Sequence, residues 1–168
     1  MKPRSAGHLH VMRTHGVNIV PIPSFSTFPL AWRWTDEKYC LLPPEELAQI
    51  IPLGAESAKR AWEKSLTFAD KNSEFSANPL LFNSIEKISS ENEGFVKVWL
   101  AQRMTAGNIT VSWQPESAVT TNTELFIKYW NEFCYPSSDD VTIWPDNESW
   151  VVHFWHEEAF CFGRSKSV

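Results

Sequence analysis

The sequence has little glycine, few cysteines and no long apolar run, and each shortage excludes a class of protein. Six glycines in 168 residues are sparse for a nucleotide site, and no glycine-rich phosphate loop, GxSxG or HExxH motif occurs. The three cysteines, Cys40, Cys134 and Cys161, show no CxxC or zinc-finger spacing. We therefore expect buried or half-buried free thiols, and we predict no metal, no cofactor and no catalytic residues.

No segment is apolar and long enough to span a membrane, so we predict no membrane partner. The apolar stretch 17–31 is interrupted by Pro21, Pro23 and Pro29, which makes it a poor signal-peptide core. Together with the unpaired cysteines, this predicts a cytoplasmic protein. The length fits one domain, and we expect residues 1–28 to be an N-terminal extension and residues 29–168 to form that domain.

Basic residues are scarce in the last third of the chain. Residues 116–162 contain only Lys128 against nine acidic residues: Glu116, Glu124, Glu132, Asp139, Asp140, Asp146, Glu148, Glu157 and Glu158. A phosphate backbone would be repelled by this segment, so we predict no nucleic-acid partner. A basic protein surface would be attracted to it.

Aromatic residues are plentiful: the chain has nine Trp and eleven Phe. Most must lie in the core, because aromatic side chains dominate burial in small domains. A small sheet and one helix can hardly bury all of those in 116–162, so some of them could serve as interface anchors. The alternative is a tightly packed core with a solvated acidic rim.

Apolar periodicity predicts an α+β fold whose N-terminal two-thirds are helical and whose C-terminus is a small antiparallel β-meander packed against one helix. A short strand is expected at 32–34. Helices are expected at 45–51, 56–68, from Asn78-Pro79 through 88, at 95–102 and at 123–133, and strands at 109–113, 141–144, 149–156 and 159–163. The alternation of Phe95, Lys97 and Trp99 leaves a strand as the alternative there. The run 149–156 is apolar on both faces, which predicts an internal strand. The helix at 123–133 should pack on the sheet through Phe126, Trp130 and Phe133.

Two clusters of reactive residues allow an enzymatic alternative. One is His153, His156, Glu157, Glu158 and Cys161, and the other is Asp139 with Asp140. His153 and His156 would point to opposite faces of a strand, which does not suit a metal site. Asp139 and Asp140 lack the ligand spacing of a calcium loop. A hydrolase or metal-dependent enzyme stays open as the second hypothesis, and its expected residues are Asp139, Asp140, His156, Glu157 and Glu158.

The run YWNEFCYPSSDDV at 129–141, followed by HEEAF at 156–160 and FGR at 162–164, resembles a family of small bacterial proteins of unknown function. That family carries a similar YWxxFCYPSSDDV segment and a final HxExFxFG stretch. The resemblance extends from about Leu30 to the C-terminus. It implies a cytoplasmic α+β protein and no particular reaction.

The first hypothesis is a small acidic binding protein that occludes a basic protein partner, such as an immunity protein that neutralises a bacterial toxin. A housekeeping adaptor without a toxin is the third. The size, the acidity and the absence of catalytic motifs favour the first. The expected partner-binding residues are Asp139, Asp140, Trp144, Asp146, His156, Glu157 and Glu158.

Overall fold

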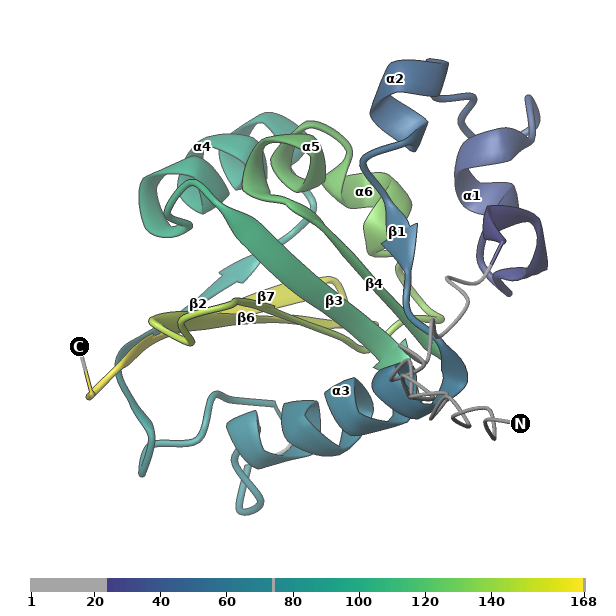
Figure 1. The fold of residues 1–168 in the computed structure, drawn as a ribbon. Helices are drawn as coiled ribbons and strands as arrows, with labels where there is room; N and C mark the ends of the chain where they lie inside the picture. Colours follow the sequence, from purple (N-terminus) through teal and green to yellow (C-terminus); the bar gives the residue numbers. More distant parts are fainter. Residues whose placement is uncertain (1–23, 74, 168) are drawn as a thin grey trace, which may run out of the picture.

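A computed structural model describes residues 24–73 and 75–167 of the chain (Figure 1). A sheet of seven strands, all pairing antiparallel, runs through this part in the order β1-β4-β3-β5-β6-β7-β2. The strands are β1 (Ile51–Pro52), β2 (Phe82–Ser89), β3 (Asn108–Gln114), β4 (Ser117–Asn122), β5 (Val141–Pro145), β6 (Trp150–Trp155) and β7 (Ala159–Ser165). The helical segments are η1 (Phe25–Thr27), α1 (Trp32–Thr35), α2 (Pro44–Leu47), α3 (Ala55–Phe68), α4 (Glu93–Arg103), α5 (Thr123–Lys128) and α6 (Trp130–Phe133).

The prediction that the N-terminal two-thirds are helical is wrong. Four strands, β1 to β4, begin within residues 51–117 and join the same sheet as the C-terminal meander. The strand predicted at 32–34 is instead the short helix α1. Trp32 and Trp34 lie in one turn of this helix, so their alternation in the sequence did not indicate a strand. The meander is the centre and one flank of a larger sheet, not a separate small one.

The C-terminal meander itself is confirmed. Strands β5, β6 and β7 pair as consecutive antiparallel hairpins, and β6 lies between the other two. The helix predicted at 123–133 breaks at Tyr129 into α5 and α6. It still packs as expected: Trp130 lies edge-on to Phe160 at 5.5 Å between ring centroids, and Phe126 lies 5.2 Å from Phe133.

A β-bulge explains why the second strand was predicted to be helical. The pairing of β2 with β7 shifts by one residue between Asn83 and Glu86, and Ser84 has a positive φ of 47°. The extra residue places Phe82 and Ile85, three apart, on the same face of the sheet. A spacing of three is the helical signal, so the sequence pattern of a bulged strand imitated a helix.

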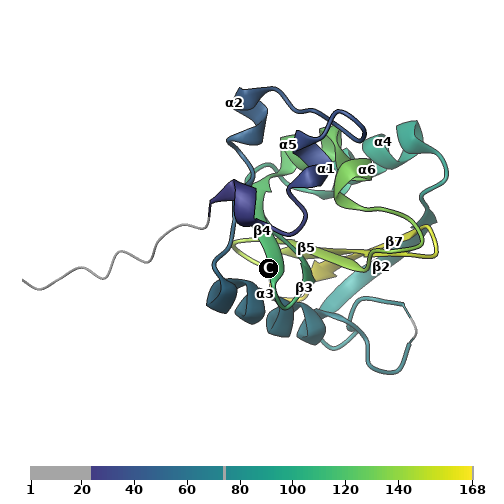
Figure 2. The ribbon, with the colours of Figure 1, turned by 90° about the vertical axis from the view of Figure 1, so that its right-hand side faces the viewer.

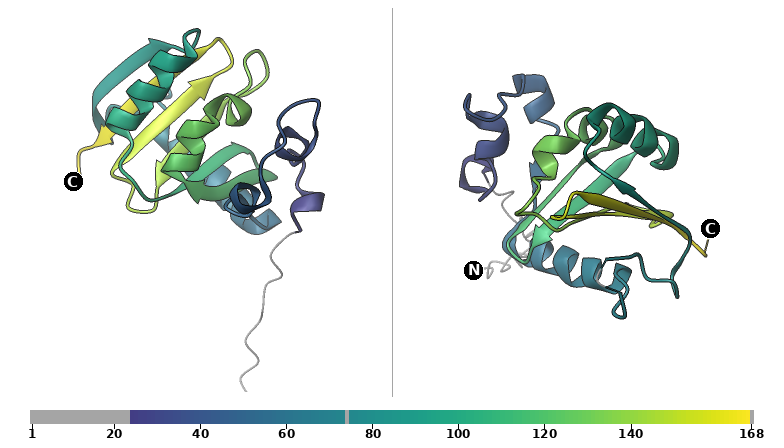
Figure 3. Two further views of the ribbon diagram at one scale, coloured as in Figure 1. Left: turned by 90° about the horizontal axis from the view of Figure 1, so that it is seen from above. Right: turned by 180° about the vertical axis from the view of Figure 1, so that it is seen from behind.

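The two faces of the sheet are covered unequally, as Figures 1 and 2 show. We call the face under α4, α5 and α6 the closed face; α1 packs behind α6, and the arrangement is also seen in Figure 3. Its core combines side chains from the strands and the helices: Trp34, Val96, Leu100, Val111, Phe126, Phe133, Ile143, Val152, Phe154, Phe160 and Phe162. We call the opposite face the open face, which is covered by α3 and by residues 69–73 and 75–81 with a smaller apolar cluster.

The ends of the chain and the cysteines complete the fold. Phe28 is buried and stacks on Trp34, so residues 25–28 of the expected extension pack against the domain. Residues 1–23 of that extension lie outside the described residues.

All three cysteines are free, with Cys134 and Cys161 buried and Cys40 half-buried, as expected. None of the described helices combines the length and the hydropathy needed to cross a membrane.

Candidate functional site

Four of the seven predicted binding residues meet at one end of the sheet. Asp140 precedes β5, and His156, Glu157 and Glu158 form the turn between β6 and β7. The Oδ1 atom of Asp140 accepts bonds from the backbone N–H of His156 at 3.2 Å and from its Nδ1 at 2.9 Å. Glu157 lies 3.7 Å from the other imidazole nitrogen. These contacts place two carboxylates, those of Asp140 and Glu157, around the half-buried His156.

The start of α4 adds further acidic residues to this end. The backbone N–H of Ser90 donates to the carbonyl of Glu158 at 2.8 Å, which places the loop before α4 beside the β6–β7 turn. Glu91 and Glu158 line the same two shallow hollows, and Glu157 lines one of them. We call the set Glu91, Asp140, Glu157 and Glu158 the acidic end. None of the four pairs with a lysine or arginine within residues 24–73 and 75–167.

Asp139 does not belong to this surface, so its assignment as a partner-binding residue is corrected. It is buried and accepts two bonds from the Arg33 guanidinium, at 2.6 and 2.9 Å. The backbone N–H of Tyr135 and the Ser138 hydroxyl also donate to it. Because its oxygens are used inside the protein, Asp139 ties α1 to the turn at 135–139.

Trp144 and Asp146 are also removed from the predicted surface. Trp144 is buried on the open face, where its ring lies 5.5 Å from that of Phe68. Asp146 is exposed, but it lies in the turn between β5 and β6. In an antiparallel hairpin that turn is at the opposite end of the strands from residues 156–158. Trp144 and Asp146 were grouped with residues 156–158 because they are close in sequence, but the sheet places them apart.

The open face carries a row of polar residues that the sequence analysis did not identify as a site. Direct cross-strand neighbours run across five pairings of the sheet. In order they are Ala118, Ser112, Thr142, His153, Cys161 and Lys87. The alternation of β6 places His153 on this face and Phe154 on the other. Ser112 on β3 and Lys87 on β2 come from distant sequence, so no local pattern marks the row.

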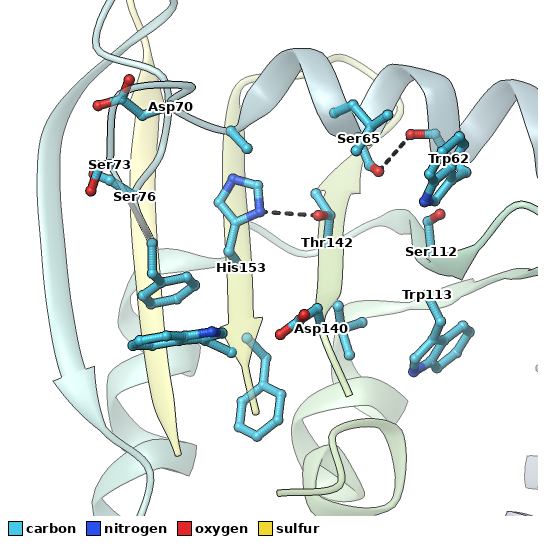
Figure 4. A pocket seen from close by; sticks show the side chains of 16 residues that line it. Trp62, Ser65, Asp70, Ser73, Ser76, Ser112, Trp113, Asp140, Thr142 and His153 are labelled. Carbon is cyan, nitrogen blue, oxygen red and sulfur yellow. Dashed lines mark hydrogen bonds between the residues drawn. The ribbon is translucent and has the colours of Figure 1, made fainter. Parts of the chain in front are cut away.

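His153 lies buried in the middle of this row, held by two hydrogen bonds. Its Nε2 lies 3.3 Å from the carbonyl oxygen of Phe68, and its Nδ1 lies 3.0 Å from the Thr142 hydroxyl (Figure 4). A carbonyl can only accept, so Nε2 carries the proton and Nδ1 accepts from Thr142. Burial lowers the pKa of His153 to about 4. The imidazole is therefore neutral at physiological pH, which explains how it lies in an interior position.

A groove of about 230 Å³ opens between this row, the end of α3 and the residues Asp70, Ser73, Phe75 and Ser76 that follow it. Its walls contain aromatic rings, hydroxyls and two carboxylates (Figure 4). The lining residues are Trp62, Ser65, Leu66, Ala69, Asp70, Ser73, Phe75, Ser76, Ser112, Trp113, Asp140, Val141, Thr142, His153, Phe154 and Trp155. Asp140 also belongs to the acidic end, so the groove and the acidic end are continuous.

Within the described residues, several of the side chains that the enzymatic alternative would use are engaged in contacts of the fold. The described part of the chain holds no group of three His, Cys, Asp or Glu side chains placed to hold a metal ion. His153 uses both nitrogens within the protein, and Asp139 is bound by Arg33. Burial raises the pKa of the Cys161 thiol beside His153, which disfavours a thiolate nucleophile. No family model, no curated protein and no solved structure matches this chain.

Proposed function

We propose that this chain is a small binding protein that occludes a basic protein partner through its acidic end, and that it acts as an immunity protein against a bacterial toxin. The observation that carries the proposal is the gathering of Glu91, Asp140, Glu157 and Glu158 from three separate segments into one surface. Like charges this close repel one another, which weakens the fold slightly unless a partner offsets the repulsion.

Exposed apolar side chains lie next to the acidic end. Helix α4 begins at Glu93, two residues after Glu91, and its first and second turns present Phe95 and Val98, which are 53% and 57% exposed. The opposite side of the helix buries Val96 and Leu100 against the closed face. An exposed aromatic residue bordered by acids combines a hydrophobic anchor with charges that attract a basic surface.

Lys87 offsets part of the negative charge of this surface, but the surface stays negative overall. It lines one of the two shallow hollows together with three glutamates, Glu91, Glu157 and Glu158. Glu93, which lines the second hollow, is paired with Lys97. The surface therefore keeps an excess of negative charge, concentrated in the turn between β6 and β7.

The test is capture of a partner from a lysate of the native host, followed by its association kinetics. The variant Glu157→Lys with Glu158→Lys should slow association about tenfold at low salt, because electrostatic steering acts mainly on the association rate. The control is Glu116→Lys with Glu124→Lys, which makes the same change in net charge at exposed residues elsewhere. Equal rates for the two variants, or an acidic partner, would contradict the proposal.

A further inference from the structure

The two edges of the sheet differ in how far they are open to another strand. One edge is β1, which has only two residues. The N–H of Leu53 donates inward to Ala118, so the preceding Pro52 puts its missing N–H on the outer side and prevents further pairing. The other edge is β2, which has eight residues and no proline. Within the described chain no strand pairs with its outer side, and Figure 3 shows β2 as the outermost strand beside β7.

The outer side of β2 carries unused backbone groups. From Glu86 to Ser89 the pairing with β7 is regular, because the bulge lies earlier in the strand. The N–H of Ser90 donates to the carbonyl of Glu158 at 2.8 Å. Successive residues of an antiparallel strand bond alternately toward one side and the other, so the N–H and C=O groups of Lys87 and Ser89 point away from β7. No backbone group in the rest of the described chain bonds to these four groups.

The charged side chains of β2 do not close this edge. Charged residues at an edge strand usually discourage pairing with another chain. Here the ammonium of Lys87 lies 5.8 Å from the ring centroid of Phe75, over the open face. The carboxylate of Glu86 accepts from the guanidinium of Arg103 at 2.9 Å, on the side of α4. Both charges are therefore held above or below the sheet, and the backbone between them stays accessible.

An exposed aromatic residue lies near the same edge. Residues 95, 99 and 103 of α4 form one row, because each lies four positions after the previous one. Arg103 ends the row and contacts Glu86 of β2, and Trp99 in its middle lies edge-on to Phe162 of β7. Phe95, which begins the row, is therefore directed to the same side of α4, and it is exposed. A strand added to β2 would find an apolar contact there.

The charges around the edge favour a basic partner over a second copy of this chain. Two copies of β2 paired antiparallel about Lys87 would place the two lysines directly opposite each other, which is destabilising. A pairing centred nearer Ser89 would bring the two acidic ends together. In contrast, a basic protein is attracted to this place, because Lys87 and Ser89 line the same hollow as Glu91, Glu157 and Glu158 of the acidic end.

We propose that the free edge of β2 receives a β-strand of the basic partner, which pairs antiparallel with the outward backbone groups of Lys87 and Ser89. The identity of the partner rests on the proposed function, whereas the bonding capacity of the edge follows from the sheet alone. The first residues of an antiparallel strand lie at the acidic end, so we expect basic residues there. The following side chains alternate between the open face, where they extend the polar row beyond Lys87, and the side of Phe95. Backbone pairing fixes a geometry that charge attraction by itself does not.

The experiment uses a synthetic peptide, so that it does not depend on the partner. The peptide acetyl-Lys-Lys-Thr-Val-Glu-Val-amide places its lysines at the acidic end, its glutamate opposite Lys87 and its valines on the side of Phe95. It is titrated into the ¹⁵N-labelled full chain, and the backbone amide signals of Lys87 and Ser89 are followed by NMR. Saturable shifts of these two signals are expected, with half-saturation at roughly 1 mM.

N-methylation of the peptide separates backbone pairing from charge attraction, because it leaves the charge unchanged. A methyl group on the glutamate nitrogen removes the N–H that donates to the carbonyl of Lys87, and it should weaken binding about tenfold or more. A methyl group on the nitrogen of the first valine is the matched control. That N–H points away from β2, so affinity should stay within about twofold of the parent peptide. Equal affinity of the two methylated peptides would overturn the proposal.

Two variants of the chain test the assigned edge. Lys87→Pro removes an N–H that β7 does not use, which an edge strand tolerates, and it should weaken binding of the parent peptide about tenfold or more. Lys87→Thr removes the same side chain but keeps the N–H, so it is the control and should bind within about threefold of wild type. Thermal unfolding checks that both variants are folded. Wild-type affinity in Lys87→Pro would overturn the assignment.

The remaining outcomes separate the two proposals. No saturable shift with the parent peptide up to roughly 10 mM, ten times what a 1 mM site needs, would overturn the strand site, and slowed association of the Glu157→Lys, Glu158→Lys variant would still support the acidic end. Shifts at Lys87 and Ser89 that depend on the concentration of the chain alone would assign the edge to a second copy and overturn the proposal. Conversely, peptide pairing combined with unchanged association of the Glu157→Lys, Glu158→Lys variant would retain the strand site and contradict the proposed function.

Discussion

The closed and open faces of the sheet are built from alternate residues of the same strands, yet they differ in almost every property. Along β6, Val152 and Phe154 face the helices and are buried among apolar side chains. His153 and Trp155 lie on the side of α3 and line the groove, whose lining also includes Phe154. The closed face therefore supplies most of the stability, and the open face can retain polar groups that do not contribute to packing. Because successive residues of a strand point to opposite faces, one segment supplies both the apolar core of the closed face and the polar side chains of the open face.

The largest expected difference in stability is between substitutions of two neighbouring residues, Phe154 and Trp155, whose side chains lie on opposite faces of the sheet. Phe154→Ala removes a fully buried ring from the closed face and should lower the free energy of unfolding by about 4 kcal/mol. Trp155→Ala removes a half-buried ring from the open face and should cost only roughly 1 kcal/mol. Denaturant unfolding of both variants gives the comparison. Equal losses would show that the faces are not energetically distinct.

The next effect concerns the ion pair that joins α1 to the turn at 135–139. Asp139→Ala leaves the Arg33 guanidinium buried without its carboxylate and should cost about 3 to 4 kcal/mol. The double variant Arg33→Met, Asp139→Ala should recover part of that loss, because no unpaired buried charge remains. Thermal unfolding of the two variants checks this. A double variant less stable than the single one would contradict the buried-charge explanation.

The buried histidine predicts a pH dependence of stability. Its pKa is about 4 in the folded protein and about 6.5 in an unfolded chain. Between these values the unfolded chain binds more protons, so stability is fully present above pH 6.5 and falls as the pH drops toward 4. The loss should be on the order of 3 kcal/mol. His153→Gln should lack this part of the pH dependence, and an unchanged profile in that variant would contradict it.

The smallest expected effect is a gain in the free energy of unfolding. Ser112→Ala removes a buried hydroxyl without a partner in the described residues and should raise the free energy of unfolding by about 1 kcal/mol. The neighbouring Thr142→Val removes a hydroxyl that is bonded to His153 and should instead destabilise by a similar amount. The opposite signs, measured by denaturant unfolding, would sharpen the distinction between the unpaired and paired hydroxyls of the open face.

How much could be predicted from the sequence depended on whether a feature was local. The meander β5–β7 and helix α3 were predictable, because their alternation and helical spacing are complete within one segment. Strand β2 was not, because its bulge gave Phe82 and Ile85 a helical spacing. The motif FCYPSSDD was noticed, but its structural role depends on Arg33, which lies 106 residues from Asp139.

The candidate site shows the same limit. Asp140 and residues 156–158 were found, because a hairpin brings them together over a short stretch of chain. The approach of Glu91 was missed, since it depends on β2 pairing with β7 at the edge of the sheet. The groove was missed as well, because it combines α3, β3, β5 and β6. Asp140 and His153 had been noticed in the sequence, but the serines and aromatics that complete the groove have no spacing that distinguishes them from core or loop residues.

The central claim is that the acidic end and the adjoining open face recognise a partner while the closed face only stabilises the fold. Mapping backbone amide shifts in the ¹⁵N-labelled chain, when the captured basic partner is added, tests this most directly. The account predicts that the largest shifts fall at Glu91, Asp140, residues 156–158 and the groove walls. Largest shifts on the outer surfaces of α1, α2 and α5, with the acidic end unmoved, would contradict it.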